Sequence, residues 1–180
     1  MKVEKTEIEG LLVIKPDIFY DSRGYFCETY NVLTFARNGI NVEFVQDNKS
    51  YSHKNVLRGL HYQTGEFAQD KLVSVSQGAA LDFAVDIRPD SPTYGKYVMV
   101  LLTAENNLMF FIPKGFAHGF VSVKEGTIFN YKCSNVYNKE SEGGIIWNDP
   151  TLAINWCVEE PIISDKDLIL PKFGEHVRHY

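Results

Sequence analysis

The sequence has no long hydrophobic run, since none of its apolar stretches reaches the roughly 18–20 residues that a membrane-spanning helix needs. Its first ten residues, MKVEKTEIEG, also lack the apolar segment of a secretory signal peptide. From these two absences we expect a cytoplasmic protein with no membrane partner.

Cysteine and positive charge are also scarce. Cys27, Cys133 and Cys157 are odd in number and share no CxxC spacing, which disfavours a disulfide framework or a zinc site and leaves buried thiols as the expectation. The net charge of −5 disfavours a nucleic-acid partner. Any phosphate group of a ligand must therefore be held by a local set of cations.

The sequence does have many short runs rich in Val, Ile, Phe and Tyr, separated by turn signals such as Asn38-Gly39 and Lys114-Gly115. The runs cover residues 11–14, 25–29, 71–76, 81–87, 97–102, 108–112, 120–123 and 127–132. Short strands at regular spacing are typical of a sandwich or barrel. Because closure into a jelly roll and pairing with a second subunit both protect sheet edges, we expect both. We predict one all-β domain over residues 1–180.

Helical signals are few. Residues 31–38 predict one short helix with Gly39 beyond its end, and Ser164 is a suitable N-cap for a second helical turn. The tail from Pro161 contains Pro171 and ends in a polar stretch. We expect it to be loosely ordered, especially from about residue 168.

The segment VLRGLHYQ places a cation and an imidazole around a glycine. In a regular strand Arg58 and His61 would face opposite ways, but a bulge at Gly59 would turn both toward one cavity. The segment is therefore either a base beside a phosphate clamp, or an ordinary strand with a surface arginine and a hydrogen-bonded histidine.

The segment IPKGFAHGF contains a PxGxxH pattern that ends at His118 and resembles the second motif of the cupin superfamily. The first cupin motif usually supplies two histidines and a glutamate as metal ligands. Here that stretch reads His61-Tyr62-Gln63, and Lys71 replaces the glutamate. Because an ammonium repels a metal ion, we expect an anion site with Lys71 and His118 as donors instead of a metal.

The remaining polar segments are ambiguous when taken singly. Tyr131 lies in a predicted strand, where a tyrosine usually serves packing, and SDKD at 164–167 alone indicates a capped helix start with a solvated face. Residues 21–24 and 46–48 each indicate a turn.

Taken in order, nine stretches resemble the dTDP-4-dehydrorhamnose 3,5-epimerase family. They are DSRGYFCETY, FVQDNKS, VLRGLHYQ, DKLVSVSQG, AVDIRPDSPTYG, FIPKGFAHGF, YKCSNVY, WNDP and SDKD, and they extend from about residue 21 to residue 167. The resemblance implies a cupin-type jelly-roll β-barrel with a few short helices, a homodimer and no metal or other cofactor. It also implies a small-molecule substrate, a dTDP-linked 4-keto sugar, which is epimerised at C3 and C5 on the route to dTDP-L-rhamnose.

The resemblance also implies roles for individual residues. His61 matches the family's base, Asp167 the carboxylate that orients it, and Tyr131 the opposing acid. Lys71 matches the lysine beside the sugar's keto oxygen. Positions that match contacts to the nucleotide, its phosphates or the sugar are Arg23, Glu28, Gln46, Asp47, Asn48, Arg58, His118, Tyr137, Glu142 and Lys166.

These residue types suit the chemistry. A proton on carbon beside a ketone can be removed if the enolate is stabilised, and a histidine of ordinary pKa about 6.5 is a suitable base at neutral pH. Lys71 would place a cation at the developing oxyanion. Inversion requires a proton from the opposite face, for which the phenol of Tyr131 is the candidate. Arginine forks bind diphosphate oxygens in pairs.

Three alternatives stay open at this point. The first is an enzyme that epimerises one carbon, or another nucleotide-linked keto-sugar, and the motif set does not exclude it. The second is a metal-dependent cupin oxygenase or isomerase, against which Lys71 and the lone His61 argue. The third is a sugar-binding module without activity, against which the joint presence of His61, Tyr131 and Asp167 argues.

Overall fold

The computed structural model describes residues 1–177 of the chain, and most of its regular structure is strand. The strands are β1 (Lys2–Lys5), β2 (Leu12–Lys15), β3 (Ile18–Asp21), β4 (Gly24–Cys27), β5 (Gln46–Ser52), β6 (Leu57–Gln63), β7 (Lys71–Gln77), β8 (Ala79–Asp86), β9 (Tyr97–Thr103), β10 (Met109–Ile112), β11 (Phe116–Ser122), β12 (Thr127–Cys133) and β13 (Glu142–Gly144). The helices are α1 (Val32–Arg37), the 3-10 turn η1 (Gly65–Phe67) and α2 (Asp165–Leu168).

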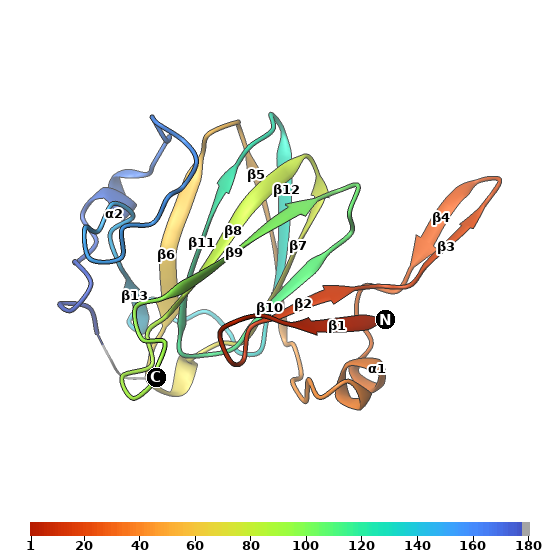
Figure 1. The fold of residues 1–180 in the computed structure, drawn as a ribbon, viewed down its shortest axis with the longest axis horizontal. Helices are drawn as coiled ribbons and strands as arrows, with labels where there is room; N and C mark the ends of the chain where they lie inside the picture. The colour runs from red at the N-terminus through yellow and green to blue at the C-terminus, as the bar shows by residue number, and fades with distance from the viewer. Residues whose placement is uncertain (178–180) are drawn as a thin grey trace.

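Two antiparallel sheets face each other to form the jelly-roll barrel, as expected (Figure 1). One has the order β1-β2-β10-β7-β12-β5, and the other has the order β13-β6-β11-β8-β9. Among residues 1–177, strands β3 and β4 pair only with each other and form a hairpin that extends away from the barrel (Figure 1).

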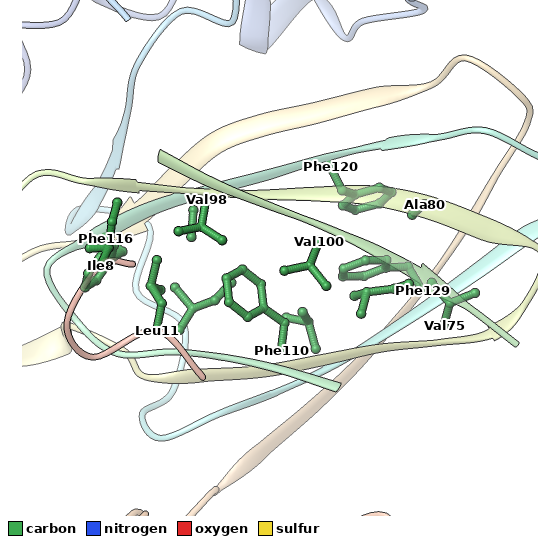
Figure 2. Close-up of a cluster of buried hydrophobic side chains, with 14 residues drawn as sticks. Ile8, Leu11, Val75, Ala80, Val98, Val100, Phe110, Phe116, Phe120 and Phe129 are labelled. Carbon is green, nitrogen blue, oxygen red and sulfur yellow. The ribbon is translucent and has the colours of Figure 1, made fainter. Parts of the chain in front are cut away.

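The barrel interior is filled at one end by apolar side chains from both sheets (Figure 2). Phe110 and Phe129 come from the six-stranded sheet, and Val100 and Phe120 come from the five-stranded sheet. Fully burying a side chain such as Phe110 contributes about 1.5–3 kcal/mol. Side chains alternate along each strand, so that inward-pointing residues form this core while outward-pointing residues lie on the outer faces of the sheets.

Each outer face carries its own apolar cover. Phe35 of α1 packs with Ile14 and Phe111 on the six-stranded sheet, and Trp156 and Leu152 pack with Phe83 on the other. The short helix 31–38 is confirmed, since the Asn31 side chain caps α1 by accepting two backbone N–H groups. The Ser164 cap of α2 is confirmed as well.

Within the described residues the tail contacts the barrel: Ile162 exchanges backbone hydrogen bonds with Asn55 and Leu57, and the carboxylate of Asp149 accepts the N–H of Phe173 at 2.9 Å. Residues 178–180 of the tail that we expect to be loosely ordered lie outside the described residues. The expectation of buried thiols is correct for one cysteine. Only Cys133 is a buried thiol, because Cys27 is partly exposed and Cys157 is exposed.

Of the helices in the described residues, none is both long enough and apolar enough to cross a membrane.

The stretch 46–48, expected as a turn, is instead the start of the strand β5. Its inward residues are the polar Gln46, Asn48 and Ser50, which line a cavity and do not join the apolar core. Strand β5 therefore shows no apolar face that a sequence pattern could detect.

Candidate active site

A cavity of about 710 Å³ lies between the two sheets, beside the apolar core. Of the residues proposed from the sequence, those that line it are His61, Tyr131, Asp167, Lys71, Gln46, Asn48, Arg58, His118, Tyr137, Glu142 and Lys166. They come from β5, β6, β7, β11, β12, β13, α2 and the loop before β13. Residues that are far apart in the sequence thus meet in one place.

A bulge in β6 explains how Arg58 and His61 share the cavity. His61 pairs with His118 on β11 and Arg58 pairs with Phe120, so that β6 has one more residue than β11 over this stretch. Gly59 has a φ of +128°, which lies in the left-handed region that side chains disfavour. A Cβ at this position would lie 2.6 Å from the Cα of Gly119. Because only glycine tolerates both conditions, Gly59 permits the bulge at this point of β6.

His61 is held by the carboxylate of Asp167. Its Nε2 lies 2.7 Å from Asp167 Oδ1, and the N–H of Gly59 donates to Oδ2 at 3.3 Å. Burial alone would raise the pKa of Asp167, but the hydrogen bond and charge of His61 outweigh it and hold that pKa below its ordinary value. A carboxylate acceptor fixes the proton on Nε2, so Nδ1 is the nitrogen of neutral His61 that can accept a proton.

Lys71 extends into the same cavity from β7, on the opposite sheet. Its ammonium donates to the backbone oxygen of His61 at 3.4 Å, and burial lowers its pKa. His118 stands directly across the strand pair from His61, with Nε2 at 2.8 Å from Asp82 Oδ2. Lys71 from one sheet and the two histidines from the other therefore line the same cavity.

Tyr131 faces the cavity from β12, in the sheet opposite to the one that carries His61. Its cross-strand neighbours are Asn48 and Val73, and its ring packs on Phe129. Burial raises the pKa of its phenol, so the hydroxyl is protonated at neutral pH and is available as a donor.

The cavity mouth is polar. The hydroxyl of Tyr137 donates to Glu142 at 3.1 Å, and Lys166 forms an ion pair with the other oxygen of Glu142. The side-chain oxygen of Gln46 accepts the backbone N–H of Tyr137 at 2.9 Å. The backbone of the loop that carries Tyr137 is therefore tied to β5.

Three of the proposed residues lie outside this cavity. Asp47 points to the outer face of β5, between two inward neighbours, and forms an ion pair with Lys132. Arg23 lies at the end of the β3–β4 hairpin and forms an exposed ion pair with Asp21. Glu28 accepts hydrogen bonds from Asn31 and Thr34 beside α1.

The sequence reasoning missed several residues at the site. Gln63 donates to Asn138 O and accepts from Asn138 N, while Gln69 donates to Asn135 O, so both hold the loop that carries Tyr137. Asp82 lies behind His118 and is fully buried. Its signal was present, since a carboxylate in the otherwise apolar run ALDFAV is costly unless it has a partner.

Comparison with known proteins shows the family of this chain. A family model described as dTDP-4-dehydrorhamnose 3,5-epimerase matches residues 5–175. The dTDP-4-dehydrorhamnose 3,5-epimerase of Escherichia coli K12 is 51% identical over 180 residues, which cover 99% of this chain and 97% of the relative. The crystal structure of dTDP-4-dehydrorhamnose 3,5-epimerase from Elizabethkingia anophelis is similar with a TM-score of 0.94 and 49% identity, and the match covers 100% of this chain and 99% of that one.

A second solved structure includes a sugar nucleotide. It is the dTDP-6-deoxy-D-glucose-3,5-epimerase of Legionella pneumophila in complex with dTDP-4-keto-L-rhamnose. Its TM-score is 0.89 and its identity 45%, with 96% of this chain and 98% of that chain covered.

Proposed function

The chain belongs to the dTDP-4-dehydrorhamnose 3,5-epimerase family, and on that premise we propose how its residues carry out the reaction. The enzyme inverts C3 and C5 of dTDP-4-dehydro-6-deoxy-D-glucose to give dTDP-4-dehydro-L-rhamnose. In this proposal, residues 1–180 form one jelly-roll epimerase domain. The observation that carries the mechanism is that His61 and Tyr131 face one cavity from opposite sheets.

His61 begins the reaction by accepting the proton from the carbon beside the C4 ketone. Asp167, at 2.7 Å from Nε2, stabilises the imidazolium that forms. The electron pair moves onto the ketone oxygen, where the ammonium of Lys71 stabilises the enolate. Tyr131 then donates its phenolic proton to the opposite face of the same carbon, which inverts it.

C3 and C5 both flank C4, so one enolate site serves both carbons after the sugar turns in the cavity. Between inversions the proton on His61 returns to solvent and Tyr131 is reprotonated. Arg58 and Lys166 supply cations for the diphosphate, and Tyr137 at the mouth offers a flat apolar face to the nucleobase.

The enzyme works as a homodimer in this proposal. The β3–β4 hairpin exposes Phe19, Tyr20, Tyr25 and Phe26, whose exposed fractions are 53–74%. An isolated hairpin is only marginally stable in water, and an exposed apolar patch of this kind marks an interaction surface. Arg23 and Glu28 lie on or beside this hairpin, outside the cavity of their own chain, so a substrate role for them requires a second copy.

Proton NMR in D2O tests the reaction. Incubated with dTDP-4-dehydro-6-deoxy-D-glucose, the protein is expected to introduce deuterium at both C3 and C5. His61→Ala is expected to abolish that exchange while dTDP still binds in calorimetry. Deuterium at one carbon only would establish a single-carbon epimerase, and absence of exchange would refute the proposed reaction.

Mixing two inactive variants tests the dimer. If Arg23 completes the cavity of a second copy, mixed dimers of His61→Ala and Arg23→Ala contain one intact site and recover part of the activity. A monomeric mass by light scattering, or no recovery after subunit exchange, would exclude the shared site.

We also propose a cytoplasmic location. The three unpaired cysteines are consistent with the reducing cytoplasm, and cell fractionation tests that location.

A further inference from the structure

A second His–Asp pair, in which His118 lines the cavity and Asp82 lies behind it, has no role in the reaction as described. His118 Nε2 is 2.8 Å from Asp82 Oδ2. Asp82 is completely buried, and within residues 1–177 its Oδ1 has no hydrogen-bond partner. A buried carboxylate with an unused oxygen is costly unless a nearby positive charge compensates it.

Lys71, which lines the cavity beside His118, is a positive charge that acts on this carboxylate. Its ammonium has three donors, and the described structure gives it one long hydrogen bond, to His61 O. Burial lowers the pKa of Lys71, and the carboxylate of Asp82 is one of the charges that oppose this effect. Each of the two groups thus has few hydrogen bonds in the described residues, and the charge of each acts on the pKa of the other.

The other titratable groups around Lys71 do not replace Asp82. On β12, burial raises the pKa of the Cys133 thiol and keeps it neutral. On β13, Glu142 already forms an ion pair with Lys166 at the mouth. On β11, burial lowers the pKa of His118, so its imidazole is neutral, and on β6 His61 is paired with Asp167. Burial also raises the pKa of Asp82, and the charge of Lys71 is one of the effects that oppose this, so each of the two groups favours the charged form of the other.

We propose that Asp82 is a positioning residue whose carboxylate keeps Lys71 protonated, and through it the enolate site active, at neutral and mildly alkaline pH. Asp82 does not line the cavity, so it acts through Lys71 and His118 and not by touching the sugar. This inference rests on the proposed function, in which the charge on Lys71 stabilises the enolate.

The sign of the pH effect follows from the charges. An anion near an ammonium favours the charged form, so removing it lowers the pKa of Lys71, and the cation is lost at a lower pH. For Asp82→Asn we expect the alkaline limb of the C3 and C5 exchange rate to move about 1–3 pH units downward. Asp82→Glu, which keeps the charge, is expected to leave that limb within about half a unit of wild type.

A double-variant cycle separates this role from simple support of the fold. If Asp82 acts through the charge of Lys71, adding Asp82→Asn to Lys71→Met changes the residual exchange less than about twofold, because coupled residues are not additive. Asp86→Asn is the matched control, since Asp86 is a buried carboxylate on the same strand that pairs with Arg88. It is expected to lower stability and leave the alkaline limb in place.

Two results would overturn the inference. One is an unmoved alkaline limb in Asp82→Asn, and the other is a full Asp82→Asn effect in the Lys71→Met background. If Asp82→Asn does not fold, NMR of wild-type protein labelled at the lysine ε-carbon, assigned with Lys71→Met, decides the point: a Lys71 signal that is neutral at pH 8 contradicts the inference. Failure of wild-type exchange would instead refute the proposed reaction.

Discussion

Replacing Asp167 by asparagine would remove one charge and reverse one hydrogen bond at the base. The asparagine amide would donate to Nε2 of His61, which moves the imidazole proton to Nδ1 and blocks the nitrogen that accepts the substrate proton. The imidazolium would also lose its counter-charge. Both changes act on the step that removes the proton, and neither alters the side chains at the cavity mouth.

The size of the effect follows from the geometry. His61 Nε2 and Asp167 Oδ1 are 2.7 Å apart, which places the centres of the two charges about 4 Å apart. At an effective dielectric constant of about 20, that pair contributes about 4 kcal/mol. Since about 1.36 kcal/mol corresponds to a tenfold change in rate, Asp167→Asn should slow exchange about a thousandfold.

The assay is deuterium incorporation at C3 and C5, followed by proton NMR, with dTDP affinity from calorimetry as a check on the nucleotide site. Asp165→Asn is the control, because it removes the same charge from an exposed position of α2. Exchange by Asp167→Asn within tenfold of wild type, with the fold intact, would show that the carboxylate does not support the base.

Three further predictions follow. Tyr131→Phe should retain deuterium exchange, because His61 can remove and return a proton on one face, but should form epimerised product about 100-fold more slowly; product analysis by NMR that finds full inversion would contradict this role. Gly59→Ala should destabilise the fold by more than about 3 kcal/mol, since its Cβ would meet Gly119 at 2.6 Å, and urea unfolding measures the loss. The pKa of Asp167 is lowered by folding, so its stabilising effect is complete above about pH 4 and is lost as the pH falls through the lower folded value. The difference in melting temperature between wild type and Asp167→Asn should therefore shrink below pH 4, and a constant difference would contradict the ion pair.

The apolar strands could be predicted from the sequence, because residues such as Phe110 and Phe129 alternate with turn signals around them. Strand β5 could not, since its inward side chains are polar and face the cavity. A bulge at Gly59 could be suggested from the sequence. The close approach of Gly119, which makes glycine necessary there, could not, because it is a contact between two strands that are distant in the sequence.

The site residues divide in a similar way. His61, Tyr131 and Asp167 could be named from their motifs, and the structure brings them to one cavity. The outward direction of Asp47 follows from strand alternation, which became visible only once β5 was known to be a strand. Asp82 escaped notice because one carboxylate in an apolar run does not reveal which distant cation compensates it.

His61 and Asp167 are separated by 106 residues, and Asp167 lies on a segment that crosses the outside of the barrel to reach β6. During synthesis, a nascent chain emerging from the ribosome would build its two sheets before residue 167 was free to dock and close this wall of the cavity. A complete cavity would thus be the last feature that the polypeptide acquires.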